Sequence, residues 1–560
     1  MGVFYWKDGI LGNQTGKFGV FALGGLGEIG MNCLAVESSG RLLLVDCGAM
    51  FSSDGVGVDL IHPGFDTLAE RRDDIEGVVL THAHEDHIAG VPFLLRELDV
   101  PVYASRYALG MLGDKMVEFD LVPKLLSHTL NPGETADIGP FHLSSFPMPH
   151  SRAENMGFVI DMPGGRILHT GDFKLNLEGE AGGEDVLERL RNAAGGRVDL
   201  MLADSTGSEE DEIAGEEAEV TEALDRLVRA ATRRVFVAIF SSNVTRLKSV
   251  LEVARRHERC VALCGRSVNT HTRVASEVGI LEFPKGVVVP LEKAAELPAR
   301  KSLVVVSGTQ GEPRSALGRL ADGNHHVLKI AKDDLVIMSS RFIPGNELAI
   351  GRVIDNLFRS GAKVVHRGIE KDVHVSGHGS RQEISKAIDA VSPRCFMPMH
   401  GTYRHLVACA ELARNAGVKN VCVATDGQMV YCDDAGLRVQ EGKNPPKKIF
   451  IDGKSGLTEG AIRDRRLLGS HGVLVVAFSF SGTGDIEGNI DVVARGVTHD
   501  EALPWLADQV RDKVKDIIGS MNPDDAINAD RCRDLVRSGV RRFVSKLISR
   551  EPYVLVSVLR

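Results

Sequence analysis

The chain has 560 residues and a formal net charge of −10, and 43% of its residues are hydrophobic and 25% charged, as in a globular protein of two to four domains. The acidic balance argues against a protein that coats nucleic acid through bulk positive charge, but permits a nucleic-acid enzyme whose cations gather in one cleft. No apolar run reaches the ~20 residues that span a membrane, no signal-peptide pattern opens the chain, and nine scattered cysteines argue against a disulfide framework, so we expect a cytoplasmic protein without membrane contact.

The first predicted strand, residues 18–23, leads into a glycine-rich turn whose residues 25–30 match G-x-G-x-x-G. A dinucleotide-binding fingerprint requires a helix after this turn, whereas residues 32–36 and 41–46 predict two further strands. We therefore interpret the glycines as a tight hairpin near a site. Asp46 ends a buried strand, and a carboxylate there needs partners. It either orients a metal-binding histidine from behind or caps a turn.

A dense group of metal-binding side chains follows the predicted strand 77–80 and precedes a predicted helix at 88–98. It consists of His82, His84, Asp86 and His87. His82 and His84 point the same way in an extended chain, whereas Asp86 and His87 fall on the next bend and face a second point. Imidazole suits zinc, and mixed imidazole and carboxylate ligands also admit manganese. The run predicts two cations side by side rather than a surface loop with chance histidines.

Three further polar residues stand at predicted strand ends. His150 follows strand 142–146, Asp172 follows a strand that starts at 166, and Asp204 follows strand 198–203. Each alone is more typical of a satisfied polar group in a loop. Together they supply the ligands that the histidine run lacks for a two-metal site, namely a third histidine for one cation and a carboxylate that can bridge both.

From about residue 216 to 360 the pattern alternates between helix and strand. The predicted strands 235–239, 261–263, 302–306 and 335–339 end in Gly/Ser turns at helix starts. This arrangement predicts a parallel sheet whose edge offers backbone amides to phosphate. The acidic stretch 209–219 before it is interpreted as a solvated boundary and the start of a helix.

Histidines return beyond residue 360. His374 and His378 precede a helix at 380–391, and His400 follows strand 395–398. A domain is thus predicted to be inserted into the first one, and a Pro-rich linker at 444–448 precedes strands 472–479, 489–495 and 552–559 with helices 500–519 and 527–549. The predicted boundaries are 1–212 and 361–442 for the first domain, 213–360 for the inserted domain, 443–461 for the linker and 462–560 for a small α+β domain.

These residues resemble a known family. His82, His84, Asp86, His87, His150 and Asp172 resemble the metallo-β-lactamase fold, and Asp204, His378 and His400 resemble the extra motifs of the β-CASP nucleic-acid hydrolases. The runs 307–313, 344–347, 374–379 and 462–466 are similar to bacterial ribonuclease J, and the likeness is weakest at 209–219 and beyond 500. The resemblance implies an α/β protein, with a metallo-β-lactamase αββα sandwich, an inserted β-CASP α/β domain and a C-terminal α+β domain.

The resemblance also implies two divalent cations, zinc most readily and manganese or magnesium as alternatives. One would be held by His82, His84, His150 and Asp172, and the other by Asp86, His87, Asp172 and His400. A hydroxide shared by the cations would attack the phosphodiester, and Asp86 would help to orient it. His378, held by Asp204, would protonate the leaving oxygen. The alternative for His378 is phosphate binding without proton transfer.

A 5′-phosphate pocket is the last implied site, formed by Ser242, His374, Ser376, Gly377, His378 and Gly379. The resemblance also implies 5′-to-3′ exonuclease activity that prefers a 5′-monophosphate, together with endonuclease activity. The implied substrate is single-stranded RNA, in rRNA processing and mRNA decay, and the implied assembly is a homodimer or homotetramer. Three alternatives stay open: a β-CASP DNA nuclease, an ester or thioester hydrolase, and a non-catalytic RNA-binding scaffold. Arg341 has no assigned role; the alternatives are that it contacts RNA or that it only faces solvent.

Overall fold

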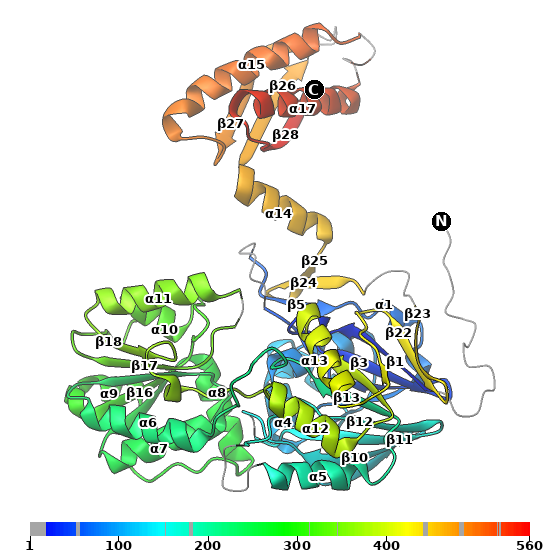
Figure 1. Ribbon diagram of the computed structural model, residues 1–560. Helices are drawn as coiled ribbons and strands as arrows, with labels where there is room; N and C mark the ends of the chain where they lie inside the picture. Colours follow the sequence, from blue (N-terminus) through cyan, green and yellow to red (C-terminus); the bar gives the residue numbers. More distant parts are fainter. Residues whose placement is uncertain are drawn as a thin grey trace. The chain divides into compact units, whose positions relative to one another are not determined.

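The computed structural model describes residues 18–51, 57–151, 153–177, 183–312, 314–343, 345–440, 446–480, 486–522, 525 and 528–559. These residues form two compact units, one of 18–51 with 60–448 and one of 57–59 with 449–559 (Figure 1). Residues 1–17 of the predicted first domain, residues 443–445 of the predicted linker, and Pro313 and Pro344 of the runs quoted above lie outside the described residues.

Two facing sheets form the sandwich in the first unit. The eight-stranded sheet has the order β23 (Gly436–Gln440), β22 (Met429–Asp433), β1 (Phe18–Gly24), β3 (Cys33–Ser38), β4 (Arg41–Val45), β6 (Ile75–Val79), β7 (Val102–Ala104) and β8 (Ser127–Thr129). The seven-stranded sheet has the order β21 (Asn420–Val421), β19 (Cys395–Met399), β13 (Leu200–Asp204), β12 (Gly165–His169), β11 (Met156–Met162), β10 (Phe141–Pro147) and β9 (Thr135–Ile138). Residues 395–440 therefore return to both sheets after the inserted domain.

The core of the sandwich lies between the sheets, where strand residues such as Val36, Leu43 and Leu202 are buried together. The outer face of the seven-stranded sheet packs against α5 (Glu184–Ala194), α12 (Arg381–Val391) and α13 (Tyr403–Asn415). The predicted helix at 88–98 is instead two helices, α2 (Glu85–Ile88) and α3 (Val91–Glu97), and α4 (Arg106–Glu118) follows β7. The break has a physical reason, because Pro92 has no amide hydrogen and stands in the first turn of α3, where none is needed.

The inserted domain is a five-stranded sheet with the order β15 (Cys260–Cys264), β16 (Ser302–Val306), β14 (Val235–Ile239), β17 (Leu335–Ser339) and β18 (Lys363–His366), and every pair is parallel. Helices α6 (Glu217–Ala230) and α7 (Val244–Arg256) lie on one face, and α10 (Ala316–Ala321) and α11 (Glu347–Arg359) on the other (Figure 1). The predicted parallel sheet is confirmed. Strand β18 follows the predicted boundary at 360 and still belongs to this sheet, while α8 (Arg266–Glu277) and α9 (Leu291–Glu296) lie between β15 and β16.

The second unit contains the strands β27 (Ile486–Arg495), β26 (Val473–Phe480) and β28 (Tyr553–Leu559) in one sheet, packed against α15 (Leu503–Gly519) and α17 (Ala529–Ile548). A hairpin of β24 (Lys448–Asp452) and β25 (Ser455–Leu457) and helix α14 (Glu459–His471) precede the sheet. All nine cysteines are free thiols. Across the described ranges, no helix is both long and apolar enough to cross a membrane.

Candidate metal centre

Strand ends from both sheets place the predicted metal-binding side chains together. His82, His84, Asp86 and His87 follow β6 of the eight-stranded sheet. The other ligands follow β10, β12 and β19 of the seven-stranded sheet, and they are His150, Asp172 and His400. Because β12, β13 and β19 are parallel neighbours, their carboxyl ends meet at one edge of the sheet. The structure thus brings all seven predicted ligands to one place.

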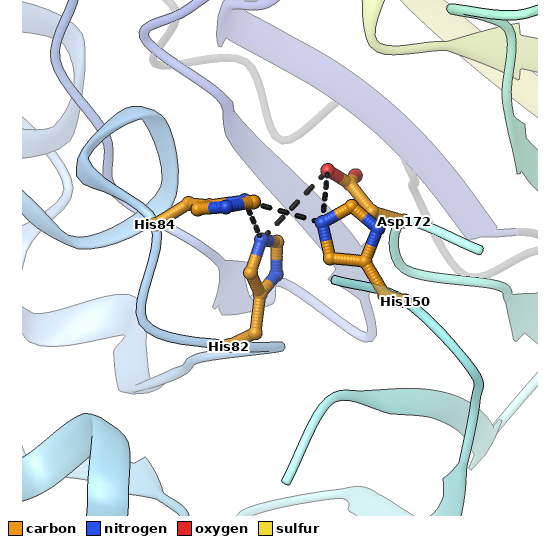
Figure 2. Close-up of side chains that lie close together, drawn as sticks. All are labelled: His82, His84, His150 and Asp172. Atoms are coloured by element: carbon orange, nitrogen blue, oxygen red, sulfur yellow. Dashed lines mark hydrogen bonds and ion pairs between the residues drawn. The ribbon is translucent and has the colours of Figure 1, made fainter. Parts of the chain in front are cut away.

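The first group consists of His82, His84, His150 and Asp172 (Figure 2). His84 Nδ1 lies 2.6 Å from His82 Nε2 and 3.3 Å from His150 Nε2. Asp172 Oδ2 lies 3.7 Å from His82 Nε2 and 3.9 Å from His150 Nε2. Four possible ligand atoms therefore converge from three separate segments of the chain, and four is the number of ligands that zinc commonly takes.

A second group consists of Asp86, His87 and His400. Asp86 Oδ2 lies 3.2 Å from His400 Nε2 and 3.7 Å from His87 Nε2. Asp172 Oδ2 also reaches this group, at 3.4 Å from His87 Nε2 and 3.6 Å from His400 Nε2. One carboxylate thus faces both groups.

Asp172 is almost completely buried, and among the described residues neither of its carboxylate oxygens has a hydrogen-bond donor. Burial alone would raise the pKa of this carboxyl, but the positive charges of His400 and His87 hold its pKa well below the usual range. A buried carboxylate without donors is costly unless a cation compensates it. The residues present therefore fit divalent cations at this position.

Hydrogen bonds behind three histidines determine which ring nitrogen faces the centre. His87 Nδ1 donates to Asp46 Oδ2 (2.7 Å), and His150 Nδ1 donates to the carbonyl of Gly377 (2.6 Å). Thr206 Oγ1 lies 2.8 Å from His400 Nδ1 and donates to the His400 carbonyl, so it accepts from the ring. In each case Nδ1 is engaged, so Nε2 is the ring nitrogen that faces the centre and could bind a metal ion.

Asp46 makes a contact of each kind that the sequence left open, one with a histidine and one within a turn. It accepts the Nδ1 hydrogen of His87, and it also accepts hydrogen bonds from the amide (2.8 Å) and hydroxyl (2.9 Å) of Thr81. Its backbone has a φ of 62°, a conformation that Asp and Asn tolerate better than most residues. The same carboxylate thus shapes the turn after β4 and orients a histidine of the second group.

His378 and Asp204 form a pair at the edge of the centre. His378 Nδ1 lies 2.7 Å from Asp204 Oδ2 and 4.0 Å from Asp172 Oδ2. Burial lowers the pKa of His378, but the charge of Asp204 and its hydrogen bond raise it above the usual value. Burial raises the pKa of Asp204, and the charge of His378 lowers it to a net value below the usual one. This pair therefore favours a protonated histidine beside an ionised carboxylate.

Comparison with known proteins agrees with this geometry. Family models match as follows: a beta-lactamase superfamily domain at 41–238, the ribonuclease J beta-CASP domain at 232–357, a Zn-dependent metallo-hydrolase RNA specificity domain at 361–423, and the ribonuclease J C-terminal domain at 460–560. The chain is 36% identical to Ribonuclease J of Mycolicibacterium smegmatis, with 97% of each chain covered. It is 35% identical to Ribonuclease J of Thermus thermophilus, with 99% of this chain and 97% of that one covered. The chain belongs to the ribonuclease J family.

A solved structure shares the fold of this ribonuclease J family member. It is a protein of unknown function from Enterococcus faecalis V583, 17% identical, with a TM-score of 0.53 over 78% of this chain and 100% of that chain. At this identity the likeness concerns the fold alone. The prediction of a metallo-β-lactamase fold with β-CASP and C-terminal domains is confirmed by the family models.

The predicted phosphate loop, residues 374–379, lies beside the centre in this ribonuclease J family chain, but its polar groups are not all available. The amide of Gly379 donates to the carbonyl of Phe173 (2.6 Å), so in this conformation it does not face a ligand. The hydroxyl of Ser376 donates to the carbonyl of His378 (2.9 Å) and accepts from its amide (3.1 Å). Ser242 and His374 are buried, and His374 Nδ1 has no hydrogen-bond partner among the described residues.

Two hydrogen bonds to residues of the centre are not predictable from the sequence. Thr206 follows Asp204 in the chain and bonds His400, and the side-chain amide of Asn32 donates to the carbonyl of Asp86 (3.1 Å). Neither residue type is distinctive in a sequence, since threonine and asparagine are common in loops. The glycine-rich turn does lie near the site as expected, because β2 (Leu26–Gly27) pairs with β20 (Gly401–Thr402) directly after His400.

Proposed function

We propose that the chain is a metal-dependent ribonuclease that hydrolyses single-stranded RNA, with 5′-to-3′ exonuclease activity that prefers a 5′-monophosphate and with endonuclease activity. The observation that carries the proposal is the position of Asp172 Oδ2, which lies within 3.4–3.9 Å of ring nitrogens of four histidines. The printed names of the relatives, Ribonuclease J, support RNA as the substrate.

Two divalent cations are proposed to bind here. His82, His84, His150 and Asp172 would hold one, and Asp86, His87, Asp172 and His400 would hold the other. Mixed imidazole and carboxylate ligands suit zinc and also admit manganese or magnesium. When bound, the cations would supply Lewis-acid stabilisation of phosphoryl oxygens and acidify water.

Asp86, Asp204 and His378 are assigned the remaining steps of the reaction. Asp86, whose side chain is 27% exposed against 1% for Asp172, is the centre's carboxylate closest to solvent, and we assign it the orientation of the attacking water. Asp204 fixes Nδ1 of His378, so a protonated His378 presents its Nε2 hydrogen to the leaving oxygen as general acid. The raised pKa of His378 keeps this proton available near neutral pH.

The 5′-phosphate is proposed to bind at Ser242, His374, Ser376 and Gly377, next to His378. This placement would put the terminal phosphate beside the proposed general acid and would be consistent with stepwise removal from the 5′ end. Changing Ser376 to Ala tests it, because the preference for 5′-monophosphate over 5′-triphosphate RNA should weaken. An unchanged preference would show that the phosphate binds elsewhere.

The proposed activity is tested with a 5′-monophosphorylated single-stranded RNA and a DNA of matched sequence, resolved by product length. Wild type with manganese or zinc should release mononucleotides from the RNA, and EDTA should stop the reaction. The variant His84→Ala should lose it, since one of the ligands in the first group is removed. Cleavage of the DNA alone would identify a DNA nuclease, and no cleavage by the metal-loaded wild type would favour an RNA-binding scaffold.

A further inference from the structure

The four consecutive acidic residues Glu209, Glu210, Asp211 and Glu212, here called the acidic segment, are largely exposed, as expected for a solvated boundary, but they also have specific partners. Each of them pairs with a basic side chain. Glu212 contacts two cations, Arg367 Nη2 at 3.2 Å and Lys371 Nζ at 2.9 Å. Glu210 pairs with Arg341, the residue to which the sequence assigned no role.

The partners come from separate parts of the chain and are here called the basic rim. Arg341 follows β17, Arg367 follows β18, and Lys371 lies in the short helix Lys371–Val373, all in or next to the inserted domain. Arg381 begins α12 and pairs with Asp211 at 3.7 Å, and Arg404 in α13 pairs with Glu209 at 3.3 Å. Lys371 and Arg381 flank the phosphate loop 374–379 on both sides.

Most of these ion pairs are exposed, and exposed pairs are weak, whereas the pair of Glu210 with Arg341 is half-buried. The side chains of Asp211 and Glu212 are 89% and 62% exposed, and those of Lys371 and Arg404 are 77% and 64% exposed. Water screens such pairs, so they are a poor means of stabilising the fold. They are correspondingly easy to exchange for another anion.

The acidic segment and the residues just before it lie against the phosphate loop. Asp204 bonds His378, Gly207 lies against the carbonyl of Gly379 so tightly that a Cβ would approach it to 2.0 Å, and the carbonyl of Glu210 accepts from the amide of Arg381 (3.1 Å). Beside them, the buried Nδ1 of His374 has no partner among the described residues. Burial, together with the positive charges of Arg246, Arg367 and Arg341, lowers the pKa of His374 well below its usual value.

We infer that the basic rim binds backbone phosphates of single-stranded RNA, and that the acidic segment occupies the rim as an internal substitute for phosphate until RNA displaces it. The inference rests on the proposed RNA substrate. It gives a thermodynamic signature, because the displaced carboxylates stay near the bound RNA and retain cations that its phosphates would otherwise release. The salt dependence of RNA binding is therefore shallower than the number of rim cations predicts.

The test measures the dissociation constant of a fluorescent single-stranded RNA in EDTA, which prevents cleavage, across a series of salt concentrations. The double variant Glu210→Gln and Glu212→Gln uncovers Arg341, Arg367 and Lys371 while keeping side-chain shape. Each removed carboxylate charge lets about 0.7 more cations leave the RNA, so the slope of log K against log salt should steepen by about 1.4. At low salt the affinity should rise by about tenfold.

Two controls isolate the effect. Glu252→Gln with Glu277→Gln removes the same charge from exposed residues that pair with arginines on their own helices, Arg256 and Arg273, and it should leave the slope unchanged. Adding Arg341→Gln, Arg367→Gln and Lys371→Gln to the uncovered variant should abolish the gain.

The outcomes separate the inference from the proposed function. If wild type cleaves RNA and the uncovered variant binds no tighter than the control, or binds more weakly, the acidic segment only holds the phosphate loop in place and the inference fails. Equal gains in both double variants would show a general charge effect and would also overturn it. If wild type neither binds nor cleaves RNA, the proposed function itself is wrong.

Discussion

Replacing Asp46 by Asn tests whether this carboxylate sets the tautomer of a metal ligand. The amide oxygen can still accept from the Thr81 amide, as Asp46 Oδ1 does at 2.8 Å. The NH₂ group then takes the place of Oδ2, 2.7 Å from His87 Nδ1, where two donors would face each other. His87 relieves this clash by moving its proton to Nε2, the nitrogen that lies 3.4 Å from Asp172 Oδ2.

The expected effect concerns one cation of the two. A proton on His87 Nε2 removes one ligand of the second group, and loss of such supporting contacts weakens metal binding by roughly 10–100-fold, about 1.4–2.7 kcal/mol. The backbone should tolerate the change, since Asn suits the φ of 62° at this position. We therefore expect a folded variant that retains one cation at wild-type affinity and binds the other more weakly.

The assay combines metal counting with competition against a chromophoric chelator, starting from metal-free protein. Asp334→Asn is the matched control, because Asp334 is also buried and accepts from a backbone amide (Ala331, 2.9 Å) and a side chain (Arg233, 3.2 Å), but lies in the inserted domain. Its metal affinity should equal that of wild type. Two cations bound to Asp46→Asn with unchanged affinity would refute the assignment of His87 as a ligand oriented by Asp46.

Three further predictions concern the pKa of His378, the close packing at Gly48 and the core of the C-terminal unit. Asp204 raises the pKa of His378, so Asp204→Asn should lower that pKa and make kcat/KM fall at lower pH on the alkaline side of a pH–rate profile; an unshifted alkaline limb would contradict a general-acid role. Gly48→Ala should reduce hydrolysis about 100-fold or more, measured as initial rates, because its Cβ would lie 1.7 Å from the carbonyl of Asp86. Leu474→Ala should lower the free energy of unfolding of the C-terminal unit by about 2–5 kcal/mol in urea titrations, because this side chain is completely buried.

Much of the architecture could be predicted because its signals are local. The inserted domain shows this best, since strands such as 235–239 and 335–339 are continuous apolar runs that end in small-residue turns, which is typical of buried parallel strands. Helix boundaries were less predictable where a single residue decides, as Pro92 does between α2 and α3. Helix α14 was not predicted, because its sequence carries many charges and only Ile462 is buried.

The candidate site divides in the same way. The run from His82 to His87 by itself indicates metal binding, because four ligand-type side chains lie within six residues on one short loop. For Asp172 and His400, separation in the sequence does not predict their proximity to the histidine run. They lie near His87 because parallel strands end at one edge of the sheet. The sequence alone therefore determined the residue types and the family likeness.

Only the tertiary structure decided the electrostatics around these residues. The sequence predicts that the acidic stretch is solvated, but it does not predict that Glu210 and Glu212 contact Arg341 and Arg367, more than 130 residues later in the chain. The sequence likewise does not predict the hydrogen bond of Thr206 to His400, or the hydrogen bond from the amide of Gly379 to the carbonyl of Phe173. Charge pairing and hydrogen bonding act over a few ångströms, so they depend on which segments folding brings together rather than on their order in the sequence.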